Sequence, residues 1–325
     1  MIIEKILKQL TPERVKREIE EVQKIKLPPE LQKWVKEYEK VGERDGFIWK
    51  WAYEVGSIIT FPDVHRKYRK DLIKIKFFLI MFIVLLDDVA DRMKDKKLLE
   101  EILKIPFGGG RILSGQMNTR KRNYLNLTIA VWQVLEEKIK LLPYYKKFKE
   151  IIKFDIKQIL NGMDYAYLIN ENPNLINEIE SQIYLSHNTP ATISYMIDLS
   201  CIPNFDMKNL KLVRKIAWYA QIMTRIANWI STWEREMKED DFTGSLFLYA
   251  SENNLFKTVR TKKEYKRNVY KIDKPMVERY FLKQWESLYK MIYRFGRENR
   301  SIKTKLILKT MEKLTILHLA NRRLI

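Results

Sequence analysis

The stretch FFLIMFIVLLDDVAD, residues 77–91, is the main basis for the fold that we predict for this chain. Its first ten residues are apolar, and three acids follow them: Asp87, Asp88 and Asp91. The apolar run is about half as long as the roughly 20 residues that a membrane-spanning helix needs. We therefore predict a buried core helix that ends in a cluster of carboxylates, and no membrane span.

Helical periodicity extends over almost the whole chain. Of the 325 residues, 46% are hydrophobic, while only ten are glycine and ten are proline. Apolar residues recur at three- and four-residue spacing in the segments 3–25, 29–44, 66–104, 123–141, 144–168, 174–200, 207–237, 243–255, 274–298 and 301–323. No linker or change of composition separates these segments. We predict an all-α fold in which residues 1–325 form a single domain, an antiparallel bundle of about ten helices.

The chain is strongly basic, with 61 Lys and Arg against 41 Asp and Glu and a formal net charge of +20. The basic residues are scattered and form no recognisable nucleic-acid module, so we expect no nucleic-acid partner. A basic helical protein that binds nucleic acid or a membrane surface without catalysis stays open as an alternative. The one cysteine, Cys201, excludes an intrachain disulfide and fits a reducing cytosol, so we expect a cytoplasmic protein.

The acids after the apolar run form a candidate metal site. Residues four apart lie on one face of a helix, so Asp87 and Asp91 share a face, whereas Asp88 points about 100° away. Carboxylates at the end of a buried helix need cations or water, and a helix C-terminus disfavours negative charge. Mg²⁺ prefers oxygen ligands, and one or two carboxylates together with a substrate phosphate are sufficient to hold it.

A second oxygen-rich stripe lies in TRIANWISTWEREMKEDD, residues 224–241. Its helical pattern places Asn228, Thr232 and Glu236 four residues apart along one face. Arg225 lies on nearly the same face and could bind a phosphate. An amide oxygen, a hydroxyl and a carboxylate in a row predict a second site for a hard cation.

The two motifs together resemble those of class I terpene synthases. DDVAD (87–91) resembles the aspartate-rich DDxxD motif of that family, and NWISTWERE (228–236) is similar to its second metal motif. The separation of about 140 residues suits the family as well. The resemblance implies the class I terpenoid synthase α-domain fold and a cluster of three Mg²⁺ ions. It carries the metal-ligand role over to Asp87, Asp91, Asn228, Thr232 and Glu236.

The resemblance also implies residues that contact a diphosphate. Arg225 matches an arginine that precedes the second motif in plant-type members, and Arg235 matches a basic residue of many microbial members. Asn188, in YLSHN (184–188), occupies the place of the diphosphate-sensing arginine of microbial members, as in plant-type ones. From the resemblance we expect Asp87 and Asp88 to act in catalysis together with Arg225.

The expected reaction is the Mg²⁺-dependent ionisation of a prenyl diphosphate, followed by cyclisation or deprotonation of the carbocation to a terpene. A C20 substrate, geranylgeranyl diphosphate or a bicyclic C20 diphosphate, is favoured, and C15 farnesyl diphosphate stays open. The resemblance points to a single-domain, diterpene-type synthase and leaves the oligomeric state open, with homodimers common in the family. A chain-elongating trans-prenyl diphosphate synthase is the alternative enzyme, although such enzymes carry a second DDxxD motif.

Aromatic side chains near the motifs are candidates for the wall that stabilises the carbocation. Phe82 is the preferred catalytic candidate, because we expect it to lie close to the direction of Asp87 and Asp91 on the helix. The other candidates are Phe78, Trp49, Tyr165, Trp218 and Trp229, and each is also compatible with an ordinary core position. The three histidines have no metal-site spacing, and none is assigned a catalytic role.

Overall fold

The computed structural model describes residues 2–108, 117–255, 261–298, 302–322 and 324–325. These residues contain fifteen α-helices, several short helical turns and no β-strand. The helices are α1 (Ile2–Gln9), α2 (Pro12–Gln23), α3 (Pro29–Glu39), α4 (Phe47–Ile58), α5 (Arg66–Asp87), α6 (Lys96–Lys104), α7 (Thr119–Lys140), α8 (Tyr145–Glu171), α9 (Glu178–Ile183), α10 (Ala191–Leu199), α11 (Leu210–Lys238), α12 (Ser245–Glu252), α13 (Lys262–Val269), α14 (Lys274–Glu298) and α15 (Thr304–Ala320). The prediction of an all-α fold is confirmed.

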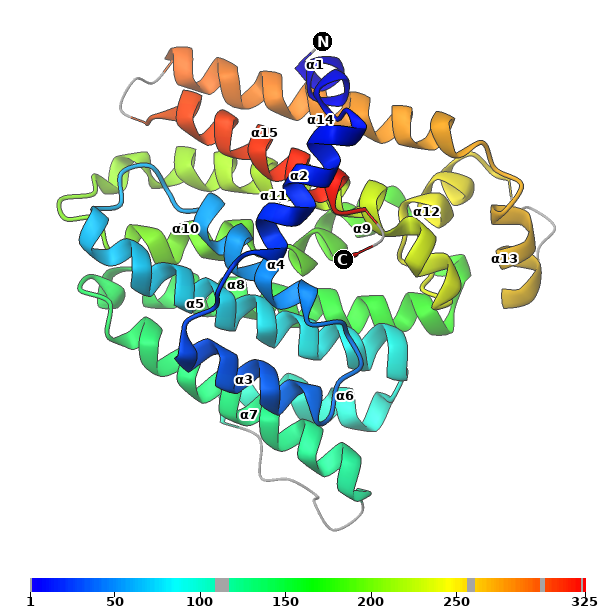
Figure 1. The fold of residues 1–325 in the computed structure, drawn as a ribbon, viewed down its shortest axis with the longest axis horizontal. Coiled ribbons are helices and arrows are strands. Elements are labelled where there is room, and N and C mark those ends of the chain that lie inside the picture. The colour runs from blue at the N-terminus through cyan, green and yellow to red at the C-terminus, as the bar shows by residue number, and fades with distance from the viewer. Residues whose placement is uncertain (1, 109–116, 256–260, 299–301, 323) are drawn as a thin grey trace.

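The long helices pack as a bundle (Figure 1). Helices α5, α8, α10 and α11 contact one another in the series α5–α8–α10–α11, and α10 also contacts α5. Helices α4 and α7 pack on α5, while α14 and α15 pack on α11. Figure 1 shows α14 and α15 along one side of the molecule and α7 along the opposite side. Helices α5 and α11 are therefore flanked by other helices on several sides.

Helix α5 is the buried core helix that its sequence predicts. Every residue from Phe77 to Leu86 is buried. The helix begins where the His65 ring accepts a hydrogen bond from the backbone N–H of Lys67, which satisfies one of the free donors of the first turn. In the described part of the chain, no helix has the length and apolar character needed to cross a membrane.

A buried ion pair joins α5 to α10. The ammonium group of Lys76 lies 2.7 Å from a carboxylate oxygen of Asp198, and both side chains are inaccessible to solvent. Asp198 also accepts a hydrogen bond from the backbone N–H of Phe61, at 2.7 Å. Removing one partner from such a pair would leave an uncompensated buried charge. The pair therefore fixes the position of α5 relative to α10.

Several predicted helices are divided in the structure. The segment 3–25 is split at Thr11, whose side chain accepts from the Arg14 N–H as the N-cap of α2. The segment 66–104 is split at Lys94, which has a left-handed backbone (φ 50°). The segment 174–200 contains α9, a 3₁₀ turn (Leu185–Asn188) and α10. Helices α4 and α13 lie outside the predicted segments, so the described chain has more helices than the ten predicted.

Candidate active site

A cavity of about 110 Å³ brings the two predicted motifs together. Asp87 at the end of α5 and Asp91 just beyond it line the cavity. The α11 residues that line it are Thr224, Arg225, Asn228, Thr232, Arg235 and Glu236. Its remaining polar lining comes from Arg44, Asn188, Thr189, Asp241, Thr243 and His318, and its apolar lining from Ile48, Trp51, Val55, Ile80, Ile83, Val84, Pro190 and Ile325. Segments far apart in sequence thus form one site with a polar and an apolar part.

The backbone changes its winding where the acids lie. Residues Asp88–Met93 form a π-helical turn directly after α5. Such wide turns are rare and occur frequently at functional sites. Asp87 and Asp91 remain close enough for their carboxyl groups to hydrogen-bond to each other. The turn therefore keeps the predicted pair on one side, at the cavity.

Asp88 does not line this cavity. Its carboxylate accepts a hydrogen bond from the Tyr38 hydroxyl at 2.6 Å and lies 3.3 Å from the Tyr124 hydroxyl. The Nε of Arg44 donates to its other oxygen, also at 2.6 Å. Asp88 is 2% exposed, so these partners compensate for the burial of its charge. The structure thus separates Asp88 from Asp87 and Asp91, with which the sequence groups it.

Arg44 connects the two neighbouring aspartates. Its guanidinium forms ion pairs with both Asp87 and Asp88. Burial alone would raise the pKa of Asp87, but Arg44, a hydrogen bond with Asp91 and the charges of Arg235 and Arg225 together outweigh this effect, and the pKa of Asp87 is lowered. Asp87 is therefore ionised at neutral pH and available to a cation.

Asp91 lies in the opposite electrostatic environment. Burial, then the charges of Asp241 and Asp87, raise its pKa well above the usual range. Asn170 on α8 donates to its Oδ1 at 2.8 Å, and the Oδ1 of Asn170 accepts from the backbone N–H of Phe242 at 2.7 Å. Asn170 thereby links the acids after α5 to the loop after α11.

Glu236 is the buried end of the second stripe. The Thr232 hydroxyl lies 2.6 Å from its Oε1, whereas its Oε2 has no hydrogen-bond partner among the described residues. Burial and the charge of Asp241 raise the pKa of Glu236 to about 7. Gly244 leaves room for Oε2, because a Cβ atom there would lie 2.4 Å from it. A carboxylate oxygen without a partner, beside other carboxylates, is a position that a cation would stabilise.

Each of the two predicted arginines has a buried N–H donor that is not used by the described residues. Arg225 donates to Oδ1 of Asn228 at 3.1 Å, and its guanidinium lies 5.0 Å from the ring centre of Trp229. Arg235 donates to Glu239 at 2.7 Å. The Nε atoms of both arginines are buried and have no partner in the described part of the chain. These donors suit an anion in the cavity.

Asn188 is placed in the cavity wall by a break between helices. It ends the 3₁₀ turn Leu185–Asn188 before α10, and neither polar atom of its amide has a hydrogen-bond partner among the described residues. Gly162 of α8 permits this close approach, since a Cβ there would lie 2.6 Å from the carbonyl oxygen of Tyr184. Buried polar groups are normally paired, so an amide left unpaired at a cavity indicates a ligand-binding position.

The predicted aromatic wall does not line this cavity. Phe82 packs against Trp132 of α7, with ring centres 5.1 Å apart, and Phe78 packs against Trp34. The other candidates pack elsewhere: Tyr165 against Tyr184, Trp218 against His187, Trp49 against Tyr38 and Trp229 against Phe281. Five residues turn a helix by about 500°, so Phe82 points about 140° away from Asp87.

Sequence reasoning missed several residues of the site. Arg44, Asn170, Asp241 and His318 were not predicted, and neither was Trp51. Asp241 ends the stretch that contains the second motif, and its acidic side chain was the one signal available. The others come from separate helices or loops and share no local pattern with either motif.

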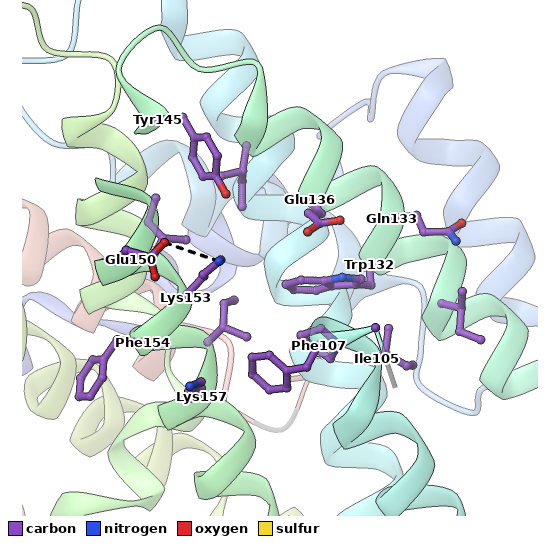
Figure 2. A pocket seen from close by; sticks show the side chains of 16 residues that line it. Ile105, Phe107, Trp132, Gln133, Glu136, Tyr145, Glu150, Lys153, Phe154 and Lys157 are labelled. Atoms are coloured by element: carbon purple, nitrogen blue, oxygen red, sulfur yellow. Dashed lines mark ion pairs between the residues drawn. The ribbon is translucent and has the colours of Figure 1, made fainter. Parts of the chain in front are cut away.

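A larger cavity lies elsewhere, between α7 and α8 (Figure 2). It has a volume of about 980 Å³ and is lined by Phe107, Trp132, Glu150 and Lys153, among others. Glu150 and Lys153 form an exposed ion pair with a separation of 3.6 Å. Because the described residues that line this groove have no buried polar side-chain atom without a hydrogen-bond partner, we assign the chemistry to the smaller cavity.

The donor set of the smaller cavity fits Mg²⁺. Its oxygens come from carboxylates, an amide and a hydroxyl, which are hard ligands. Within the described residues, no three His, Cys, Asp or Glu side chains are already arranged around one metal position. Mg²⁺ typically keeps several waters and is shared between one or two carboxylates and substrate phosphates, so a ready-made protein cage is not required.

The fold is similar to two solved structures. Abietadiene synthase from Abies grandis superimposes with a TM-score of 0.54 at 13% identity, over 94% of this chain and 37% of that protein. Heptaprenyl diphosphate synthase from Staphylococcus aureus superimposes with a TM-score of 0.53 at 12% identity, over 93% of this chain and 98% of that one. The chain has the helical fold of terpene synthases and prenyl diphosphate synthases.

The likeness to known proteins is found by comparing structures and not by comparing whole sequences. No protein-family profile and no curated protein sequence matches the chain. The chain spans little more than a third of the length of abietadiene synthase. At identities of 12–13% the likeness concerns the fold, and it is shared equally by the two kinds of protein.

Proposed function

We propose that this protein is a Mg²⁺-dependent class I terpene synthase that ionises a prenyl diphosphate and converts the carbocation to a terpene. One observation carries the proposal. Asp87 and Asp91 meet Asn228, Thr232 and Glu236 in a single cavity that also holds two arginines and an apolar wall. A prenyl diphosphate has this same division between a strongly anionic head and a hydrocarbon tail. We propose that residues 1–325 act as one catalytic domain in the cytoplasm.

Each group of residues has a distinct task in this proposal. Asp87, Asp91, Asn228, Thr232 and Glu236 would hold Mg²⁺. When bound, Mg²⁺ supplies Lewis-acid stabilisation of the leaving diphosphate. Arg225 and Arg235 donate hydrogen bonds to the same anion and offset its growing charge, as preorganised donors do in other enzymes.

The apolar part of the cavity protects the carbocation. Ile80, Ile83 and Val84 line it one to two turns before Asp87, so they lie beside the expected position of the allylic carbon. They offer no nucleophile and exclude water. Trp51 contributes the one aromatic ring among the cavity residues other than that of His318, and its face can stabilise a cation.

The cavity also bears on the size of the substrate. Its volume of about 110 Å³ is below the roughly 300–1,000 Å³ of typical small-molecule sites. Binding of a prenyl chain therefore requires the wall side chains to rearrange. The preference for C20 diphosphates therefore rests on the motifs and not on the cavity volume, with farnesyl diphosphate as the alternative.

The test is turnover by the purified protein. It is incubated with Mg²⁺ and, separately, with farnesyl, geranylgeranyl and bicyclic C20 diphosphates, and the organic extract is analysed by gas chromatography–mass spectrometry. We expect a hydrocarbon or terpene alcohol that depends on Mg²⁺ and is lost in Asp87→Ala. Folded wild-type protein that releases no diphosphate from any of these substrates would contradict the proposal.

Chain elongation is the second candidate, because the likeness to heptaprenyl diphosphate synthase extends over nearly all of that protein. An elongating enzyme forms a longer prenyl diphosphate only when isopentenyl diphosphate is added. Adding isopentenyl diphosphate to each reaction therefore separates the two functions. Asn228, Thr232 and Glu236 favour the terpene synthase, since an elongating enzyme is expected to carry aspartates there.

A further inference from the structure

His318 of α15 lines the cavity without a bonding partner. The side chain is 1% exposed, and neither ring nitrogen has a hydrogen-bond partner among the described residues. A neutral imidazole carries one N–H donor and one lone pair. Leaving such a group unpaired in the interior destabilises the folded protein, so its presence calls for an explanation beyond packing.

The other two histidines have structural explanations. His187 is buried as well, but its Nδ1 lies 3.1 Å from Nε2 of Gln221, and its ring packs against Trp218. His65 is the N-cap of α5. All three histidines belong to the described residues, and of the three only His318 lines the cavity. It is thus the one imidazole placed to meet a ligand there.

The surroundings of His318 keep its ring neutral and fixed. Its ring stands edge-on to Trp51 of α4, with centres 5.0 Å apart and planes at 77°. Burial lowers the pKa of His318 to about 3, and no charged neighbour contributes to this shift. At neutral pH the ring therefore presents a free lone pair in a cavity wall that is otherwise apolar on the α4 side, where Ile48 and Val55 flank Trp51.

We propose that His318 is the base that ends the reaction by taking a proton from the carbocation. This inference rests on the proposed function and deepens it. The C–H bond next to the cationic carbon breaks, and its electron pair becomes the π bond of the product. The proton bonds to the imidazole lone pair, and the imidazolium then passes it to the departing diphosphate or to water.

The proton transfer does not require a strong base. A carbocation is so strongly acidic that a weakly basic lone pair suffices, provided that it lies within reach of one particular C–H bond. What matters is a neutral acceptor at a defined place. His318 would consequently determine which alkene forms, in addition to how fast it forms.

The first test compares His318→Phe with a matched control, His187→Phe. Both changes replace a buried imidazole that packs against a tryptophan by another aromatic ring. We expect the share of the wild-type alkene among the products to fall at least about fivefold in His318→Phe. Alcohols from water capture or isomeric alkenes would replace it. His187→Phe should keep the wild-type product composition.

An unchanged product composition in His318→Phe, at wild-type stability, overturns the inference. If His318→Phe fails to fold, the milder His318→Gln is used, because it keeps a polar side chain but removes the basic ring nitrogen. Wild-type protein that releases no diphosphate would contradict the proposed function itself, and this outcome is distinct from an unchanged product pattern in the variant.

The second test does not depend on turnover. The protein is labelled with ¹⁵N-histidine, and the His318 signal is assigned by its absence in His318→Phe. A long-chain tertiary ammonium ion, which has the charge and shape of a prenyl cation, is added with Mg²⁺ and inorganic diphosphate. We expect the ring signals of His318 to shift while those of exposed His65 stay in place. No shift of His318 at saturation would place the cation elsewhere and overturn the inference.

Discussion

Two adjacent aspartates, Asp87 and Asp88, have opposite surroundings. Asp87 reaches the cavity, whereas Asp88 is enclosed by Tyr38, Tyr124 and Arg44. One residue turns a helix by about 100°, which is enough to direct one carboxylate to the cavity and the next into the protein interior. We therefore propose that Asp87 binds the metal and that Asp88 positions Arg44.

The pair can be separated by two matched substitutions. Asp88→Asn leaves the Arg44 charge partly uncompensated, and we expect a loss of about 3 kcal/mol in the free energy of unfolding. Asp87→Asn should lower Mg²⁺-dependent turnover at least about 100-fold with a smaller effect on stability. Urea unfolding and diphosphate release measure the two effects. Equal losses of turnover in both variants would show that Asp88 acts on the substrate directly.

His318 predicts a specific pH dependence of stability. In the unfolded chain it takes up a proton near pH 6.5, whereas burial lowers its pKa in the folded protein to about 3. The unfolded state binds more protons between these values, so stability falls as the pH decreases below 6.5. From pH 7.5 to pH 5 we expect the wild type to lose on the order of 2 kcal/mol more than His318→Phe.

The comparison is made by urea unfolding of both proteins at each pH. The pKa of His187 is also lowered by burial, to about 4, but His187 is present in both proteins and cancels. Parallel stability curves for the two proteins would mean that the ring of His318 is solvated in the folded state.

At the level of single helices, the end of α11 depends on the loop that follows it. The backbone N–H of Asp241 donates to the carbonyl oxygen of Glu236, and the Asp241 carboxylate accepts from the backbone N–H and the hydroxyl of Thr243. This tight turn brings Gly244 back against Glu236. The position of a proposed metal ligand is thus set by a glycine eight residues later in the chain.

Gly244→Ala tests this arrangement. The new Cβ would lie 2.4 Å from Oε2 of Glu236, so the carboxylate must move. We expect the affinity for Mg²⁺ to fall about 10- to 100-fold, which is the usual effect of changing a residue that orients a metal ligand. We also expect the free energy of unfolding to fall by about 1–3 kcal/mol. Titration of turnover with Mg²⁺ measures the first quantity.

Gly46→Ala is the control, because a Cβ there approaches no atom closer than 3.9 Å and the backbone has a helical φ of −60°. The control should behave as wild type. A Gly244→Ala protein with unchanged Mg²⁺ dependence would remove Glu236 from the metal site.

For the molecule as a whole, the cavity joins segments from both halves of the chain. Its lining comes from α4 and α5 on one side and from α11 and α15 on the other. A ligand that binds across these helices stabilises the folded state because the unfolded chain lacks the site.

Mg²⁺ with inorganic diphosphate should therefore raise the melting temperature. At concentrations 100-fold above Kd the stabilisation is about 2.7 kcal/mol, or about 4 °C for a chain of this size. Differential scanning fluorimetry measures the shift, and EDTA should abolish it. Glu236→Gln provides the matched variant, and a shift of equal size in that protein would show that the ions bind elsewhere.

The fold class followed from the sequence because helical periodicity is a local property. Each apolar stripe could be read within one segment, and the run from Phe77 to Leu86 indicated burial without any knowledge of its neighbours. The ends of the helices were harder to predict from the sequence. The break at Lys94 depends on a left-handed backbone conformation. Helix α4 was not predicted because it contains few polar residues, so its sequence has no clear polar face.

The same distinction applies to the site. Asp87 and Asp91, and likewise Asn228, Thr232 and Glu236, are related by helical spacing, so the sequence alone determined which oxygens share a face. How the helices pack could not be predicted from either segment: it makes the two faces meet, turns Phe82 towards α7, and brings Arg44 and His318 into the same cavity. Helical spacing is a local property, because it is set by the backbone of one helix. The wall of a cavity depends on how helices that are far apart in the sequence pack together.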